Sequence, residues 1–97
     1  MSNILNNLGM ANRARQLVFG KHLVLEGIRH NDICLVFLAS DTGQNTTKKI
    51  KDKSKFYNVE VNCDFTTAEI SAALGKANLK VVGLKKSGTS FLKILGK

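Results

Sequence analysis

The sequence predicts an α/β protein, a three-layer α/β/α sandwich built on a mixed four-stranded sheet. Helical and strand-like segments alternate along the chain, which is typical of a sheet packed between layers of helices. Residues 33–39 (ICLVFLA) are continuously apolar, as expected for a central strand that is covered on both faces. A chain of 97 residues is expected to form one domain, residues 1–97.

The first predicted helix covers residues 2–16. Ile4, Leu8 and Ala11 fall on one helical stripe, so this helix is expected to bury one face. A short strand is predicted directly after it, at residues 17–20 (LVFG).

Residues 21–31 predict a second helix, because Val24, Leu25 and Ile28 recur at helical spacing. The preceding Gly20 is either a simple turn or the point where this helix begins. In the second case the first N–H groups of the helix would be unpaired, and such a helix start is a ready binding site for an anion.

The third predicted helix lies within residues 40–58, where Asp41 or Thr42 would cap its start. Its apolar stripe is thin and rests on Ile50 and Tyr57. The rest of this segment is rich in lysine, so most of its surface is expected to face solvent.

The next two segments are a strand and the clearest helix of the chain. Residues 59–63 alternate between apolar and polar and predict a strand with one wetter face. Residues 66–75 predict a helix, because Thr66 and Glu69 have the spacing of a capping box and Gly75 can end the helix.

The chain is expected to end in one more strand and a closing helix. Residues 79–84 (LKVVGL) predict the strand, and residues 87–97 predict the helix, with Ser87 as its cap. The inward side chains of this helix would be Phe91, Ile94 and Leu95.

Charge is the strongest signal in the composition. Fifteen Lys and Arg residues stand against seven Asp and Glu, for a formal net charge of +8 at pH 7. Such a basic protein is expected to bind a polyanion, RNA or DNA first and an anionic membrane surface second. The alternative is that the charge serves only solubility.

The densest basic stretch lies in the third helix and is predicted to be its solvated outer face. It would add a diffuse, sequence-independent attraction to phosphate. Only Phe56 and Tyr57, at its end, are aromatic, which gives little support to a base-stacking platform. Its lysines are Lys48, Lys49, Lys51, Lys53 and Lys55.

No catalytic, cofactor or metal motif is found, so the protein is not expected to be an enzyme or to take a small-molecule substrate. His22 and His30 lie eight residues apart, without the spacing of a histidine metal site. A phosphate-binding P-loop would need a glycine where Arg15 stands, and Ser or Thr after the lysine, where His22 stands.

The chain is predicted to be cytoplasmic. Its N-terminus (MSNILNNLGMANRARQ) lacks the basic start and long apolar run of a secretory signal. The longest apolar run, residues 33–39, is too short to span a bilayer. Cys34 and Cys63 form no CxxC pair and are predicted to be buried, reduced thiols.

Three stretches occur in an order typical of a known family. They are LGMANRARQLVFG, LVFLASDTGQNTTKKIKDKSKFYNVEV and ISAALGKANLKVVGL. Over almost its whole length the chain resembles the YlxQ-type bacterial members of the kink-turn-binding ribosomal protein family, the L7Ae family. This resemblance implies an α/β/α sandwich that binds structured, kink-turn-like RNA. It further implies association with the ribosome or ribosomal RNA. The protein is also predicted to be a monomer.

The resemblance also implies where RNA would bind. In the family, a Gly-x-Asn-Glu-type motif at the start of the second helix recognises tandem sheared G·A pairs in a kinked helix. The loop before the last strand makes a second contact. The corresponding residues here are Gly20, Lys21, His22 and Leu23 at the helix start, and Lys76, Ala77, Asn78 and Leu79 in the loop.

Three positions depart from the family pattern. His22 stands for the asparagine, Leu23 for the glutamate, and Glu26 for a lysine that commonly helps to bind the RNA backbone. Leucine cannot accept hydrogen bonds from guanine, and an acidic residue repels phosphate. Two alternatives therefore stay open: a structured-RNA binder without kink-turn specificity, or a protein-interaction adaptor that kept the fold. The net charge of +8 speaks against a pure adaptor.

Overall fold

The computed structural model describes residues 3–87, with side chains described from Asn7 onward. In chain order the elements are α1 (Asn3–Arg13), β1 (Leu17–Phe19), α2 (Lys21–Arg29), β2 (Ile33–Leu38), α3 (Gln44–Phe56), β3 (Glu60–Asn62), α4 (Thr67–Leu74) and β4 (Val81–Lys85). Helices and strands alternate in this range, as the sequence predicts. Beyond Ser87, the closing helix predicted at residues 87–97 lies outside the described residues.

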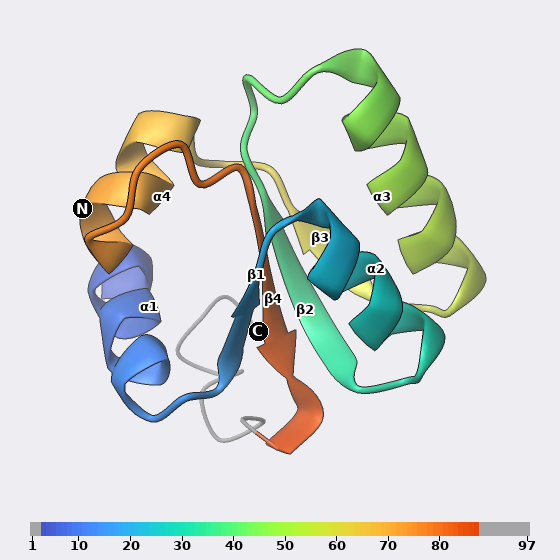
Figure 1. The fold of residues 1–97 in the computed structure, drawn as a ribbon, viewed down its shortest axis with the longest axis horizontal. Helices are drawn as coiled ribbons and strands as arrows, with labels where there is room; N and C mark the ends of the chain where they lie inside the picture. Colours follow the sequence, from blue (N-terminus) through green and yellow to red (C-terminus); the bar gives the residue numbers. More distant parts are fainter. Residues whose placement is uncertain (1–2, 88–97) are drawn as a thin grey trace.

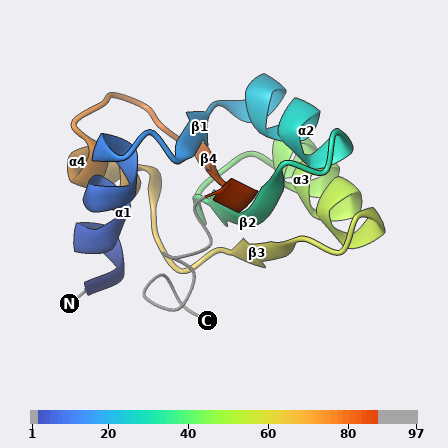
Figure 2. The same ribbon diagram turned by 90° about the horizontal axis from the view of Figure 1, so that it is seen from below.

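The four strands form one mixed sheet in the order β1-β4-β2-β3. Strand β4 is antiparallel to both β1 and β2, whereas β2 and β3 are parallel. Helices α1 and α4 cover one face of this sheet, and α2 and α3 cover the other (Figure 1, Figure 2). The predicted three-layer α/β/α sandwich with a mixed four-stranded sheet is therefore confirmed.

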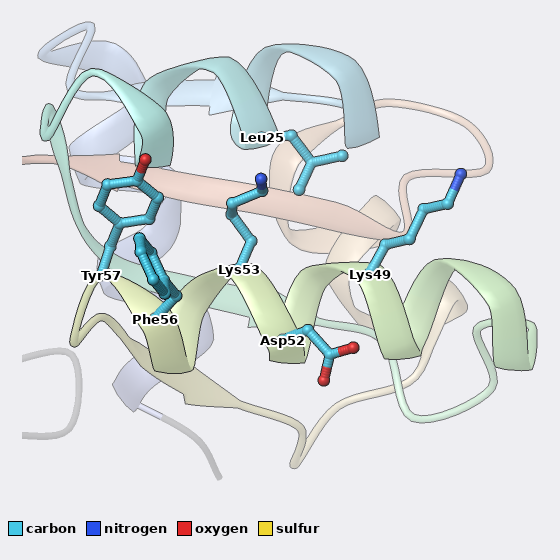
Figure 3. Close-up of a pocket in the computed structure, with 6 residues that line it drawn as sticks. All are labelled: Leu25, Lys49, Asp52, Lys53, Phe56 and Tyr57. Atoms are coloured by element: carbon cyan, nitrogen blue, oxygen red, sulfur yellow. The ribbon is translucent and has the colours of Figure 1, made fainter.

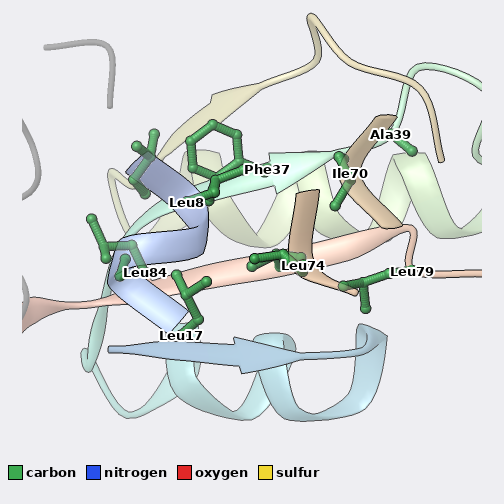
Figure 4. Packing of buried hydrophobic residues seen from close by; sticks show 11 residues of the cluster. Leu8, Leu17, Phe37, Ala39, Ile70, Leu74, Leu79 and Leu84 are labelled. Carbon is green, nitrogen blue, oxygen red and sulfur yellow. The ribbon is translucent and has the colours of Figure 1, made fainter. Parts of the chain in front are cut away.

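Each face of the sheet carries its own apolar core. The core under α1 and α4 is shown in Figure 4, and its buried residues are Leu8, Ala11, Leu17, Leu35, Phe37, Ala39, Ile70, Leu74, Leu79, Val82 and Leu84. The core under α2 and α3 consists of Val24, Ile28, Ile33, Val36, Leu38, Ile50 and Val81. Strand β2 supplies side chains to both cores, which explains why its sequence is apolar without alternation.

Two glycines allow α2 to lie close to the sheet. The side chain of Ile33 in β2 occupies the space beside Gly27 of α2 and Gly83 of β4. A Cβ atom at Gly27 would lie 2.6 Å from Ile33 Cγ1, and one at Gly83 would lie 3.0 Å from Ile33 Cδ1. A Cβ atom at Gly27 would force the Ile33 side chain or α2 to shift, and one at Gly83 would make a tight contact with Ile33.

The capping box predicted for the fourth helix is confirmed. The Thr66 hydroxyl accepts a hydrogen bond from the Glu69 N–H at 3.2 Å, and the Glu69 carboxylate accepts one from the Thr66 N–H at 2.9 Å. Gly75 ends the helix in the left-handed conformation, with φ of 66°. The loop that follows α4 therefore leaves the helix in a defined direction.

The predicted cap of the third helix is wrong. Helix α3 begins after Gly43, and no side chain caps its start. The Asp41 carboxylate instead accepts two hydrogen bonds from Thr67, at the start of α4. The backbone carbonyl of Thr42 accepts a hydrogen bond from the Thr47 hydroxyl at 3.3 Å. This is not a cap, in which the Thr42 hydroxyl would accept a hydrogen bond from a backbone N–H of the helix. Asp41 lies two residues before the N-cap Gly43, and its carboxylate binds the start of α4 instead.

The prediction that both cysteines are buried is also wrong, since Cys34 and Cys63 are free thiols with intermediate exposure. Cys34 lies where the register between β2 and β4 shifts, between Ile33 and Leu35. At this irregularity its thiol faces the carbonyl oxygen of Leu84, at 3.6 Å, and is only partly covered. Cys63 follows the end of β3, where the sheet stops shielding it.

Candidate nucleic-acid interface

Gly20 lies at the start of α2. The sequence leaves two roles open for this glycine, a simple turn or the beginning of a helix, and the structure shows the second. Gly20 is the N-cap residue, with φ of 93° and ψ of 151°. This backbone conformation is accessible almost only to glycine. A Cβ atom at Gly20 would meet nothing within 4 Å, so the glycine is required by the backbone and not by crowding. The surface at Gly20 is open to a ligand.

The N-terminal end of α2 is uncapped. The first intrahelical hydrogen bond runs from the Val24 N–H to the Gly20 carbonyl, at 3.0 Å. The N–H groups of Lys21, His22 and Leu23 precede it and have no acceptor within the helix, and Gly20 has no side chain to supply one. These groups carry the partial positive charge of the helix end. Together with the Lys21 ammonium they form a site suited to an anion.

The side chains of the first turn are exposed. Lys21, His22 and Leu23 all point away from the core, and Leu23 is 56% exposed although it is apolar. The sequence predicts these three residues as part of the site. Their exposure makes them accessible to a ligand, and no hydrogen bond of the described structure depends on the side chains of His22 or Leu23.

The loop between α4 and β4 lies beside the start of α2. The Gly20 N–H donates a hydrogen bond to the Val81 carbonyl at 2.9 Å, so the end of this loop adjoins the helix start. The Lys76 ammonium lies 4.9 Å from the centre of the ring of Phe19, the residue that precedes Gly20 in the chain. Both segments lie at the same end of the sheet (Figure 1). The structure thus brings together the two segments that the family resemblance indicates. Gly20 and Lys76, which represent them, are 56 residues apart in the sequence.

Within the loop, the predicted residues have two different environments. Lys76, Ala77 and Asn78 are exposed, and Asn78 adopts the left-handed conformation with φ of 54°. Leu79 is only 8% exposed and belongs to the core under α1 and α4. Its N–H donates a hydrogen bond to the Ser71 hydroxyl at 2.8 Å. Leu79 therefore anchors the loop, whereas Lys76 and Asn78 present polar groups to a ligand.

A hydrogen-bonded cluster ties together the loops at this end of the sheet. The Asp41 carboxylate, in the loop after β2, accepts hydrogen bonds from the Thr67 N–H at 2.9 Å and the Thr67 hydroxyl at 2.8 Å. Lys80, just before β4, donates to the Thr67 hydroxyl at 3.2 Å. The hydrogen bonds from Thr67, first from its hydroxyl and then from its N–H, lower the pKa of Asp41. The carboxylate thus stays charged and holds three segments in place.

A groove between α2 and α3 adds a feature that the sequence analysis missed. It has a volume of about 530 Å³ and is lined by Leu25, Lys49, Asp52, Lys53, Phe56 and Tyr57 (Figure 3). The lysines of this segment are predicted as a solvated face, but Lys49 and Lys53 line the groove on one side of α3. The i, i+4 spacing of Lys49 and Lys53, and of Asp52 and Phe56, is the signal that could have placed these residues on one face.

The described residues contain neither a cluster of metal ligands nor a membrane-spanning helix. Within residues 3–87, no group of three or more His, Cys, Asp or Glu side chains could hold a metal ion. In the same range, no helix is long and apolar enough to cross a membrane. What the geometry offers instead is an open helix end and exposed cationic side chains at one end of a sheet. These features define an α/β/α domain with a surface suited to an anion.

The chain belongs to the ribosomal protein L7Ae/L30e/S12e/Gadd45 family, whose family model matches residues 2–93. It is 40% identical to the RNA-binding protein YlxQ of Enterococcus faecium over 84 residues, which cover 87% of this chain and 81% of that protein. It is 38% identical to the RNA-binding protein YlxQ of Bacillus subtilis (strain 168) over 81 residues, which cover 84% of this chain and 81% of that protein. These relatives confirm the predicted family resemblance.

Two solved structures have the same fold. A protein of unknown function from Bacillus halodurans C superposes with a TM-score of 0.86 at 32% sequence identity, covering 97% of both chains. The Giardia lamblia 15.5kD RNA binding protein superposes with a TM-score of 0.83 at 15% identity, covering 97% of this chain and 82% of that one. At the lower identity the likeness concerns the fold alone.

Proposed function

We propose that this protein binds structured RNA, as a single domain over residues 1–97, and that it is a binding protein and not an enzyme. The observation that carries the proposal is the contact of two segments at one end of the sheet. The uncapped start of α2, at Gly20, adjoins the loop that presents Lys76. The relatives named as RNA-binding proteins support the same function.

The binding mode follows from the charges of this surface. An RNA phosphate near the first turn of α2 would accept hydrogen bonds from the unpaired N–H groups and lie close to the Lys21 ammonium. Lys76 and Asn78 would contact the RNA from the other side. Because the formal net charge is +8, attraction over longer distances would add to these contacts. The cluster around Asp41 would keep the neighbouring loops rigid.

We further propose that the target is a kink-turn-like RNA, associated with the ribosome, and that the protein acts as a cytoplasmic monomer. One observation favours a second candidate, a structured-RNA binder without kink-turn specificity. Leu23 is 56% exposed at the position where the family pattern has a hydrogen-bonding glutamate. An exposed leucine cannot accept a hydrogen bond from a guanine, so the first turn of α2 would offer less base recognition than the family motif.

Two charge reversals test the proposed surface. Lys21→Glu changes an exposed lysine at the start of α2, and Lys51→Glu changes an exposed lysine on the outer face of α3. We expect Lys21→Glu to weaken binding to a stem–internal loop–stem RNA with tandem G·A pairs about tenfold or more, since it removes a contact and adds repulsion. Lys51→Glu should weaken binding only a few-fold. Fluorescence anisotropy gives the affinities, and circular dichroism checks the fold. Equal losses would contradict the surface.

The salt dependence of binding gives a second measure of the same surface. Affinity should fall steeply as salt increases, with a logarithmic slope of roughly −0.9 for each phosphate contacted, the value for duplex DNA. If Lys21 contacts a phosphate, Lys21→Glu should reduce the slope by about one. Lys51→Glu should change the slope less. A flat salt response of the unmodified protein would contradict electrostatic RNA binding.

A further inference from the structure

We propose that the groove between α2 and α3 binds an unpaired nucleotide of the same RNA that is held at the start of α2. The inference rests on the proposed function, because it assigns a second contact to that RNA. It concerns residues outside the helix start and the loop after α4. The residues that carry it are Lys49, Lys53, Phe56 and Tyr57 on α3 and at its end, with Leu25 facing them from α2 (Figure 3).

The groove has the size and the apolar surface for a nucleobase. Its volume of about 530 Å³ lies within the range of small-ligand sites, roughly 300–1,000 Å³. Phe56 is 79% exposed, which is unusual for so large an apolar side chain. Its ring contacts the Tyr57 ring in an edge-to-face geometry, with the ring centres 4.9 Å apart. Tyr57 thus supports the Phe56 ring while most of that ring remains open for stacking.

The charges beside the aromatic pair fit a phosphate. Lys49 and Lys53 line the groove, and within residues 3–87 neither forms an ion pair. The one acidic residue of the lining, Asp52, lies 3.2 Å from the Lys48 ammonium, which partly neutralises it. A nucleotide has both a flat base and a phosphate. An aromatic pair next to unpaired lysines matches this combination better than it matches a purely apolar or a purely acidic ligand.

The groove is continuous with the proposed RNA surface. A second cavity of about 210 Å³ is lined by His22, Leu25, Glu26, Arg29 and Lys53. It shares Leu25 and Lys53 with the larger groove and reaches His22, in the first turn of α2. Leu25 lies four residues after Lys21, about 6 Å along the helix. A strand leaving the start of α2 could therefore reach the groove by passing Glu26 on the side of Arg29 and Lys53.

Three RNAs and a matched pair of variants test this inference on the full chain. One RNA is a blunt stem–internal loop–stem with tandem G·A pairs, and the others carry four unpaired adenosines at the 5′ or the 3′ end. Phe56→Ala removes the exposed ring, and Met10→Ala removes another exposed apolar side chain, on α1. We expect at least one extended RNA to bind more tightly than the blunt RNA. Phe56→Ala should lower the affinity for that RNA about tenfold.

The blunt RNA and the control variants make the outcome specific. Phe56→Ala should leave the affinity for the blunt RNA unchanged, and Met10→Ala should change neither affinity. Lys53→Gln should lower the affinity for the extended RNA more than the affinity for the blunt RNA. Lys51→Gln changes a lysine outside the groove, and it should lower both affinities slightly and by the same factor.

The possible failures are distinguishable. If the extensions add no affinity and Phe56→Ala has no effect, while Lys21→Glu still weakens the blunt RNA, the groove does not bind RNA and the proposed function stands. The same result is expected if the groove is occupied by a protein segment, and it overturns the inference. If no RNA binds to the unmodified protein, the proposed function fails and the inference fails with it.

Discussion

The Asp41 carboxylate binds Thr67, 26 residues later in the chain, through the hydroxyl at 2.8 Å and the backbone N–H at 2.9 Å. The contact joins the loop after β2 to the start of α4. It gives Thr67 a charged acceptor in addition to the capping box of Thr66 and Glu69. The start of α4 is therefore held twice, and the loop after β2 is fixed relative to the end of the sheet.

This relationship predicts a pH dependence of stability. Hydrogen bonds from Thr67 lower the pKa of Asp41 in the folded protein. The Asp41 carboxylate therefore contributes fully to the free energy of unfolding at pH values above its unfolded pKa, about 4. The contribution is lost as the pH falls through the lower, folded pKa. We expect Asp41→Asn to be less stable than the unmodified protein at pH 7, with a difference that narrows toward pH 3. Urea unfolding at both pH values measures this.

The matched control for Asp41 is Asp52→Asn. Asp52 forms an exposed ion pair with Lys48, and such surface pairs contribute little to stability. Its replacement should change the urea midpoint only slightly at either pH. A difference between Asp41→Asn and the unmodified protein that stays constant from pH 7 to pH 3 would show that the charge of Asp41 is not the cause.

Two glycines that precede helices should respond differently to alanine. Gly20 and Gly43 are both N-cap residues with open space around the Cβ position, but φ is 93° at Gly20 and −59° at Gly43. Gly20→Ala forces alanine into a conformation that it rarely adopts, and we expect a loss of about 1–3 kcal/mol in the free energy of unfolding. Gly43→Ala should change it by less than about 1 kcal/mol. Thermal and urea unfolding measure both, and equal effects would argue against backbone strain at Gly20.

The Cys34 thiol should react slowly, and Cys34 and Cys63 should remain unpaired with each other. Burial raises the pKa of the Cys34 thiol, which reduces its reactive thiolate at neutral pH. Cys34 packs against the core under α1 and α4, and Cys63 against the core under α2 and α3. Because they lie on opposite faces of the sheet, they cannot form an intramolecular disulfide. We expect iodoacetamide to label Cys34 several-fold more slowly in the folded than in the urea-unfolded protein, and intact mass spectrometry to detect no disulfide. Equal labelling rates would contradict the packing of Cys34.

Local signals explain which parts of the fold could be predicted from the sequence. The continuous apolar run of β2 and the capping box of α4 each depend on neighbours in the sequence, and both are confirmed. The cap of α3 could not be predicted in this way. In the sequence Asp41 is a possible cap for α3, but the helix begins after Gly43, and the Asp41 carboxylate binds Thr67, a partner that only the tertiary structure brings close.

The candidate site shows the same division. Gly20 as a helix start is a local feature, and the structure shows it. Leu79 is buried because α4 packs on the sheet. The groove lined by Lys53 and Phe56 exists because α2 packs beside α3. Both features depend on how helices pack. A lysine-rich helix looks uniformly solvated in sequence. Only the position of Leu25, opposite α3, makes one of its faces a groove.

The first turn of α2 should be convertible to stronger kink-turn recognition. His22 and Leu23 are exposed, and no described hydrogen bond depends on their side chains, so His22→Asn with Leu23→Glu should leave the fold intact. The new carboxylate would accept hydrogen bonds from guanine, as in the family motif. We expect the ratio of affinities for a kink-turn RNA over a plain duplex of equal length to rise roughly tenfold, the value of one charge-assisted hydrogen bond.

The ratio is the appropriate measure because the added negative charge weakens binding to every RNA. The control is His22→Asn with Leu23→Ala, which removes the same apolar side chain but adds no carboxylate at position 23, and its ratio should not rise. If the carboxylate variant and this control discriminate equally, the first turn of α2 does not contact the G·A pairs. The RNA would then be held by charge alone, and Lys21→Glu would reduce the affinity for the kink-turn and for the duplex by the same factor.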